Sequence, residues 1–213
     1  MKKILDIYAE YKIMPNLQEH QLRVAAVASL ICDNFEESLD KENIVTACLL
    51  HDMGNILKFN LNVFPELNKP EGKEYWEKVK YEYLKKYGTD EHIATLKIVQ
   101  ELKAPSRVLE LINAVSFLGA PKTVLEEDFG GKIVECCDSR VDPFGIVTLE
   151  ERFADLKKRY AHRGGDTPER EAYQNAVRLM EKQIFAKCKI KPEDINDETV
   201  APIIAELRNF VIA

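Results

Sequence analysis

Four residues of this sequence have metal-binding side chains in strongly apolar surroundings: His20, the adjacent pair His51 and Asp52, and Asp138. A titratable side chain in such surroundings costs free energy unless it is paired or bound to a cation. Two imidazoles and two carboxylates form the mixed nitrogen and oxygen shell that Mn, Fe, Co, Ni or Mg accepts. The residue types therefore indicate a candidate site for a divalent metal ion.

Each of these residues also has a purely structural interpretation. A single histidine beside an apolar face is often a hydrogen-bonded core residue, and an aspartate often caps a helix or orients its neighbour. The order along the chain favours a shared site, because the first histidine is followed after 31 residues by the His-Asp pair and after a further 86 residues by the last aspartate. We therefore interpret the four residues as one constellation.

Helices are expected to position these residues. Apolar side chains cover most of the circumference of a predicted helix over residues 17–35, so this helix should lie in the middle of a bundle, with His20 near its start. Asp40 can cap a helix that leads into His51, and a short apolar helix carries Asp138. Strand-like alternation is absent from the sequence. The predicted fold class is all-α.

The rest of the chain is also predicted to be helical, because capping signals precede most of its apolar segments. These signals are Asn16 with Glu19, Thr89 or Asp90, Thr148 with Glu151, Thr167 with Pro168, and Asp197. Residues 55–72 contain prolines, a glycine and several asparagines, so we expect a loop there that borders the site and sets specificity. His162 lies in a glycine-containing turn and is interpreted as a surface residue or loop contact.

The composition is that of an ordinary globular chain: 213 residues, 46% hydrophobic and 31% charged. A net charge of −6 argues against extended nucleic acid as a partner, since phosphate neutralisation dominates that affinity. The aromatic and lysine-rich run over residues 73–88 is accordingly interpreted as a helix with a core-facing stripe. No window approaches the roughly 18 apolar residues of a membrane span, and the five cysteines lack CxxC spacing. We expect a cytoplasmic protein without a membrane partner.

The three segments around the candidate ligands resemble the HD-domain superfamily of metal-dependent phosphohydrolases. The signature of that superfamily is a His, a His-Asp doublet and a distant Asp. The matching segments are EHQLRVAAVA around His20, TACLLHDMGN around the doublet and VECCDSRVD around Asp138. The resemblance covers about residues 16–145 and implies an HD-domain-like helical bundle with additional C-terminal helices. It also implies that His20, His51, Asp52 and Asp138 bind one divalent ion (Mn, Co, Ni, Fe or Mg).

The resemblance further implies an enzyme that hydrolyses a phosphate ester or anhydride of a small, nucleotide-like substrate through a metal-activated water. Phosphomonoesterase and phosphodiesterase activity both remain open. Asp52 would act as ligand and proton acceptor, and Asn55 would position water or substrate. Many relatives carry Lys at the position of Asn55, and a deoxynucleotidase branch carries Glu there. The cationic candidates for phosphate binding are Arg23, Lys58 and Arg140, with His92 near the substrate.

Two alternatives remain at this point. A few proteins of this fold are dinuclear iron oxygenases, and His92 keeps a second metal possible. A non-catalytic module that binds a nucleotide or a metal is also compatible, because Asn55 is neither an acid nor a base near neutral pH. We expect an HD-type domain over residues 1–147 and a C-terminal helical extension over residues 148–213, packed on the same domain. Apolar residues near the C-terminus, such as Ile203 and Phe210, leave a homodimer open.

Overall fold

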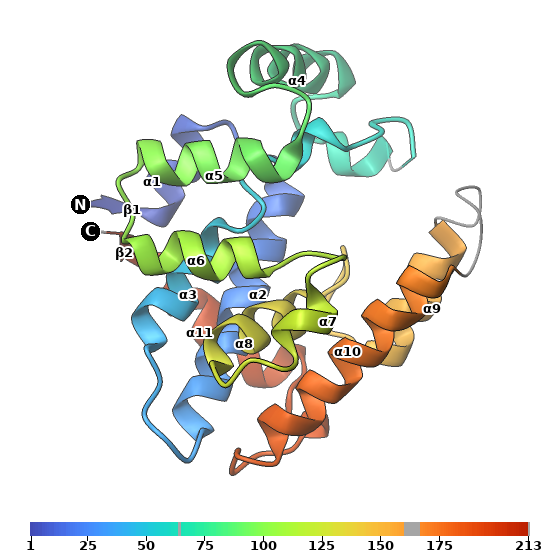
Figure 1. Ribbon diagram of the computed structural model, residues 1–213. Helices are drawn as coiled ribbons and strands as arrows, with labels where there is room; N and C mark the ends of the chain where they lie inside the picture. Colours follow the sequence, from blue (N-terminus) through green and yellow to red (C-terminus); the bar gives the residue numbers. More distant parts are fainter. Residues whose placement is uncertain (64, 160–166, 213) are drawn as a thin grey trace.

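The computed structural model describes residues 1–63, 65–159 and 167–212, and this part of the chain is built almost entirely of helices (Figure 1). In chain order the α-helices are α1 (Ile4–Glu10), α2 (Pro15–Asn34), α3 (Lys41–Leu50), α4 (Lys73–Tyr87), α5 (Glu91–Glu101), α6 (Ser106–Ala114), α7 (Ala120–Thr123), α8 (Phe129–Asp138), α9 (Leu149–Arg159), α10 (Pro168–Phe185) and α11 (Asp197–Leu207). The prediction of an all-α fold is confirmed. His162 lies outside the described residues.

Helix α2 lies at the centre of the bundle, where it packs against α3, α8 and α11 (Figure 1). The reason is visible in its composition, because the residues from Val24 to Ala28 are completely buried. Small alanine side chains on this stretch let neighbouring helices approach closely, and the valines fill the space between them. A helix that is apolar on most sides belongs inside the fold, and α2 confirms that expectation.

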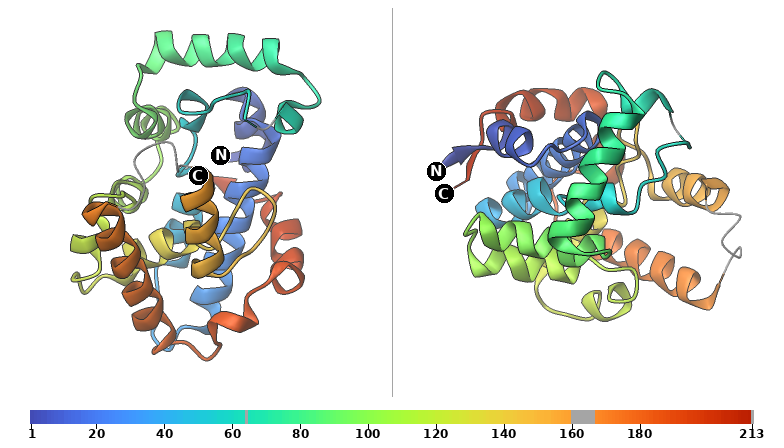
Figure 2. Two further views of the ribbon diagram at one scale, coloured as in Figure 1. Left: turned by 90° about the vertical axis from the view of Figure 1, so that its right-hand side faces the viewer. Right: turned by 90° about the horizontal axis from the view of Figure 1, so that it is seen from above.

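Helices α9 and α10 lie next to one another on the side of the molecule away from the termini (Figures 1 and 2). Leu149 and Phe153 of α9 pack against Val177 of α10 in a small apolar cluster of their own. Helix α10 also packs against α7 and α8, and α11 packs against α2. Helices from the C-terminal third therefore contact the same bundle that carries the candidate metal ligands.

The two ends of the chain are paired. Strands β1 (Lys2–Lys3) and β2 (Val211–Ile212) form a short antiparallel ladder, the only sheet within the described residues. The described part of the chain also contains three 3₁₀ segments: η1 (Asn55–Leu57), η2 (Pro65–Asn68) and η4 (Pro192–Asp194). Two of them interrupt the predicted loop over residues 55–72.

None of the described helices is both long enough and apolar enough to cross a lipid bilayer.

Most predicted helix caps are present. The side chains of Asp40, Asp90 and Thr167 each accept a hydrogen bond from a backbone amide in the first turn of their helix. Thr148 and Glu151 form the expected reciprocal box in front of α9.

Two predicted caps are wrong. Helix α2 begins at Pro15 after Met14, because proline suits the first turn, so Asn16 lies inside the helix. Helix α11 is capped by Asn196, whose carboxamide accepts two amide hydrogen bonds, and Asp197 is the first helical residue.

Candidate metal centre

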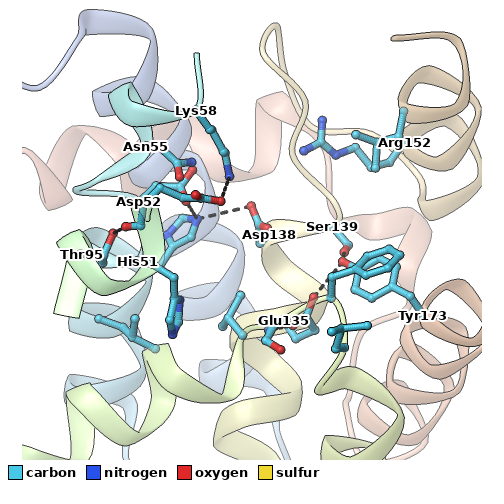
Figure 3. A pocket seen from close by; sticks show the side chains of 18 of the residues that line it. His51, Asp52, Asn55, Lys58, Thr95, Glu135, Asp138, Ser139, Arg152 and Tyr173 are labelled. Atoms are coloured by element: carbon cyan, nitrogen blue, oxygen red, sulfur yellow. Dashed lines mark hydrogen bonds and ion pairs between the residues drawn. The ribbon is translucent and has the colours of Figure 1, made fainter. Parts of the chain in front are cut away.

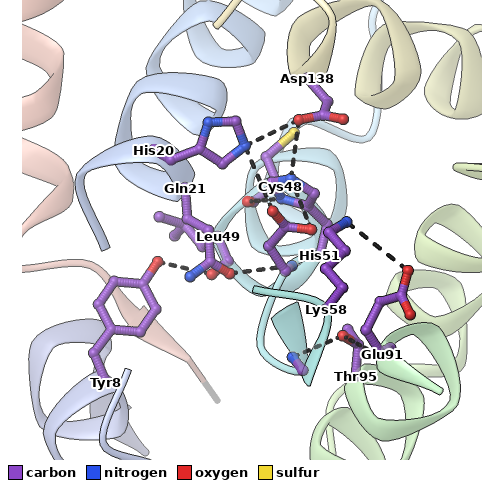
Figure 4. A network of polar contacts seen from close by, with 12 residues as sticks. Tyr8, His20, Gln21, Cys48, Leu49, His51, Lys58, Glu91, Thr95 and Asp138 are labelled. Carbon is purple, nitrogen blue, oxygen red and sulfur yellow. Dashed lines mark hydrogen bonds and ion pairs between the residues drawn. The ribbon is translucent and has the colours of Figure 1, made fainter. Parts of the chain in front are cut away.

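The four predicted ligands meet where three helices come together (Figure 4). His20 lies in the second turn of α2, His51 and Asp52 follow the last residue of α3, and Asp138 is the last residue of α8. Asp138 Oδ1 lies 2.9 Å from His20 Nε2 and 3.3 Å from His51 Nε2. The Asp52 carboxylate oxygens lie 3.7 Å from the same two ring nitrogens. Residues from three separate stretches of sequence thus form one compact cluster.

These donor-to-donor distances suit a shared divalent ion. Ligand atoms about 2.1 Å from an ion and at right angles to one another are about 3.0 Å apart, and wider angles give longer separations. The observed separations of 2.9 to 3.7 Å fall in this range. His20, His51 and Asp52 form the group of potential ligands with all donor atoms within 4.8 Å. The residues present therefore match the requirements of a divalent metal site.

The orientation of His51 supports the same conclusion. Its Nδ1 atom lies 2.8 Å from the carbonyl oxygen of Cys48, one turn earlier, so Nδ1 carries the proton and donates it. The opposite nitrogen, Nε2, is buried and makes no well-aligned hydrogen bond within the described residues. A carbonyl that fixes one ring nitrogen as donor leaves the lone pair of the other nitrogen for a metal.

The electrostatics of the cluster favour a positive charge at its centre. Burial opposes protonation of His51, but the negative charges of Asp52 and Asp138 outweigh this effect and raise the pKa of His51 to about 9. Burial likewise opposes the charged form of Asp138. The contacts with His20 and His51 nevertheless hold the pKa of Asp138 well below its usual range. The carboxylates that favour an imidazolium ion here would equally favour a bound cation.

A tight turn over residues 51–54 brings His51 and Asp52 to the cluster. Gly54 packs so closely on α5 that a Cβ atom at this position would lie 2.3 Å from the carbonyl oxygen of Glu91. The Gly54 amide donates to the hydroxyl of Thr95 on α5, and the Asp52 amide donates to the side-chain carbonyl of Gln21 on α2. The two hydrogen bonds hold the turn between α2 and α5. The close approach to the carbonyl oxygen of Glu91 explains why the residue at position 54 is a glycine.

The cluster forms one end of a cavity of about 670 Å³ (Figure 3). The near wall contains residues from the turn after α3 and from α5, and the far wall comes from α9 and α10. The residues from the far wall are Arg152, Phe153, Leu156, Arg170, Tyr173 and Gln174. Among the described residues of the predicted loop over residues 55–72, Asn55 and Lys58 line the cavity. The far wall of the cavity is thus formed by the C-terminal helices, and the described part of the loop contributes two lining residues beside the ligands.

Three of the predicted functional residues line the cavity beside the ligands. Asn55 is buried in η1, one turn after Asp52, to whose carbonyl oxygen its amide donates. Lys58 lies at the end of η1 with its Nζ atom 3.9 Å from Glu91. His92 lies in the first turn of α5 and contacts the side chain of Asn113 at 3.3 Å. All three positions are compatible with the predicted contacts to water or substrate.

The two predicted arginines lie elsewhere. Arg23 is half-buried on α2 and is not among the described residues that line the cavity. Three residues of a helix turn the chain by about 300°, so Arg23 points about 60° away from His20. Arg140 has 3% of its surface exposed and makes an ion pair of 2.6 Å with Glu181 and a hydrogen bond to the carbonyl of Pro192. The prediction that Arg140 binds substrate is therefore wrong. Its guanidinium instead connects the turn after α8 to Glu181 of α10 and to Pro192.

Glu135 was not predicted as a site residue, although it is buried and lines the cavity (Figure 3). Its carboxylate accepts hydrogen bonds from the Ser116 amide at 3.0 Å and the Tyr173 hydroxyl at 2.8 Å, and that hydroxyl also lies 2.9 Å from Ser139 Oγ. Burial is the main cause that raises the pKa of Glu135 to about 7. The sequence did contain a signal for this site residue, because Glu135 is a charged residue in a predicted apolar helix, one turn before Asp138.

Comparison with known proteins agrees with the geometry. A family model for the HD domain matches residues 17–139, a segment that contains all four candidate ligands. No curated protein and no solved structure gives a significant match.

Proposed function

The chain belongs to the HD-domain family, a superfamily of metal-dependent phosphohydrolases, and we propose that it hydrolyses a phosphate ester or anhydride of a small, nucleotide-like substrate. The observation that carries this proposal is the convergence of His20, His51, Asp52 and Asp138 at one end of a large cavity. A cavity of about 670 Å³ has the size of a small-molecule site.

A divalent ion at such a site lowers the pKa of a bound water and offsets negative charge on a phosphoryl group. His20 and His51 would hold the ion through ring nitrogens, and Asp52 and Asp138 through carboxylate oxygens. Asp52 would also accept the proton that the attacking water loses, because its side chain lies at the cavity surface beside Asn55. Asn55 would orient that water through its carboxamide.

Lys58 and His92 are proposed to contact the substrate. Both line the cavity on the side of the metal ligands. Lys58 is only loosely paired with Glu91, at 3.9 Å, so its ammonium group can approach a phosphate oxygen without losing a close ion pair. His92 can present its ring to the substrate from the first turn of α5.

Five free cysteines accord with the reducing conditions of the cytoplasm, where we propose that the protein works.

One ion per chain is favoured over two. Within residues 1–63, 65–159 and 167–212, one group of three or more potential ligands has the required spacing. His92 is outside that group and contacts Asn113 instead. The dinuclear iron oxygenase is thereby disfavoured. The non-catalytic nucleotide- or metal-binding module remains the second candidate, because Asn55 offers no acid or base.

The proposal is tested with a panel of nucleotides and simple phosphate esters in the presence of Mn, Co, Ni or Mg. Phosphate release by wild-type protein is compared with release by His51→Ala and Asp52→Ala, and the melting temperature of each variant is measured. We expect metal-dependent phosphate release that both substitutions abolish without unfolding the protein. A wild-type protein that binds metal but hydrolyses none of the panel would favour the non-catalytic module.

A further inference from the structure

Arg152 lies on the far wall of the cavity, in the first turn of α9 and outside the segment that matches the HD domain. Its guanidinium points away from α9 and across the cavity toward Asp52 and Asp138 (Figure 3). Only 14% of its side chain is exposed. An arginine with so little exposure, whose guanidinium points from the opposite wall toward the candidate metal ligands, is unusual on a surface helix.

Among the described residues, the charge of Arg152 is only partly compensated. Its ion-pair partner there is Asp155, at 3.8 Å, a distance beyond that of a hydrogen bond. Asp155 is itself held by a close ion pair with Arg159, so two guanidinium groups share one carboxylate. The local balance of these three side chains is one excess positive charge.

The hydrogen-bond donors of Arg152 point to the same conclusion. Its Nε–H group is buried and has no hydrogen-bond partner among the described residues. A buried donor without a partner costs free energy, and this cost is removed when a ligand supplies an acceptor. A guanidinium with free donors in a fork is well suited to a phosphate group, which offers several oxygen atoms.

Building on the proposed function, we propose that Arg152 is a substrate-binding residue that grips phosphoryl oxygens from the wall opposite the metal ligands. The phosphate of the substrate would then lie between the cluster on α2, α3 and α8 and the guanidinium on α9. The C-terminal helices would in this way complete a phosphate site whose metal-binding half belongs to the matched domain. The relevant ligand chemistry is a phosphate group with at least two free oxygens.

The test is a calorimetric titration with inorganic phosphate at fixed ionic strength, on metal-free protein and on protein loaded with Mn. Wild type is compared with Arg152→Gln, and Arg178→Gln serves as the matched control. Arg178 also joins α9 to α10, through Glu150, but it does not line the cavity. We expect Arg152→Gln to weaken phosphate binding about ten-fold or more and Arg178→Gln to change it less than about two-fold.

A second variant should change the affinity for phosphate in the opposite direction. Asp155→Asn removes the carboxylate that partly neutralises Arg152, so phosphate binding should become tighter. A purely structural role for Arg152 predicts no tightening. This variant also decides the question if Arg152→Gln does not fold.

Unchanged affinity in Arg152→Gln, equal weakening in Arg178→Gln, or no phosphate binding to wild type in either state would each overturn the inference about Arg152. The proposed function is judged separately. If wild type binds no metal and hydrolyses nothing, the proposed function fails, and the titration of metal-free protein still decides whether Arg152 binds phosphate. If hydrolysis depends on metal but not on Arg152, only the inference about Arg152 is overturned.

Discussion

The carboxylate of Asp138 lies 2.9 Å from the ring of His20, a contact that joins the end of α8 to the start of α2 across 118 residues of sequence. The same carboxylate oxygen lies 3.3 Å from His51. One aspartate thus touches both imidazoles of the cluster, and its charge acts on each of them.

Loss of the Asp138 charge should lower the pKa of His51. Asp52 and Asp138 together raise this pKa to about 9 in metal-free protein, against the opposing effect of burial. In Asp138→Asn one of the two negative charges is gone, so His51 should lose its proton at a lower pH. NMR titration of the His51 ring protons in wild type and in Asp138→Asn measures the change. An unchanged or higher pKa would contradict the electrostatic description of the cluster.

Metal binding should occur with one ion per chain. Substitution of His20, His51 or Asp52 by alanine removes a ligand and should lower the affinity for Mn by more than the roughly 10–100-fold expected for an outer-shell partner. His92→Ala is the matched control, because the ring of His92 contacts Asn113 and not a candidate ligand. The His92→Ala variant should retain one equivalent of metal per chain. Metal analysis of the purified proteins checks the loss of metal in the ligand variants and its retention in His92→Ala. Two irons in wild type, reduced to one in His92→Ala, would instead support the oxygenase.

Glu135 should make stability depend on pH. Its pKa is raised from 4.5 to about 7 in the folded protein, so the folded state binds its proton more tightly than the unfolded state does. The resulting stabilisation is complete below about pH 4.5 and is lost as the pH rises through about 7. Between pH 5 and 7.5, metal-free wild type should therefore lose on the order of 2 kcal/mol relative to Glu135→Gln. Urea unfolding of both proteins across this range measures the difference, and parallel pH curves would refute the prediction.

Gly54→Ala should disturb the turn that carries the ligands. The added Cβ would lie 2.3 Å from the carbonyl oxygen of Glu91 and 2.9 Å from the amide of Thr95, both of them backbone atoms that cannot move aside alone. We expect a loss of about 1–3 kcal/mol in the free energy of unfolding and weaker metal binding. Gly131→Ala is the control, since its Cβ would approach only side-chain atoms, the nearest at 3.2 Å. Equal behaviour of the two variants would argue against a special role for Gly54.

Arg140→Gln should reduce stability rather than substrate affinity. Arg140 is buried in an ion pair with Glu181 and also donates to the carbonyl of Pro192. Removal of one partner from a buried pair leaves an uncompensated charge, so we expect a loss of roughly 3 kcal/mol in the free energy of unfolding. The exposed pair of Arg178 and Glu150 is the comparison, and Arg178→Gln should cost less than about 1 kcal/mol. A variant with wild-type stability but weakened phosphate binding would restore the substrate role first predicted for Arg140.

Much of this protein follows from local sequence. The caps at Asp40 and Thr148 depend on side chains that bond amides only a few residues away, so their pattern can be recognised in the chain itself. The central place of α2 follows from apolar residues on most of its sides. The ligand types and their order indicated a metal site for the same reason, because imidazoles and carboxylates in apolar segments need a partner.

The far side of the cavity required the three-dimensional arrangement. Glu135 becomes a buried site residue because Tyr173, 38 positions later, brings its hydroxyl to the carboxylate. Arg140 and Arg152 are both arginines near the end of the matched segment, yet one meets Glu181 on α10 and the other faces an open cavity. Nothing local distinguishes them, since the partner of a long charged side chain depends on which distant helix packs beside it. The sequence alone thus predicted the helices and the candidate metal ligands, whereas the packing of α9 and α10 against the rest of the bundle decided which charged side chains line the cavity.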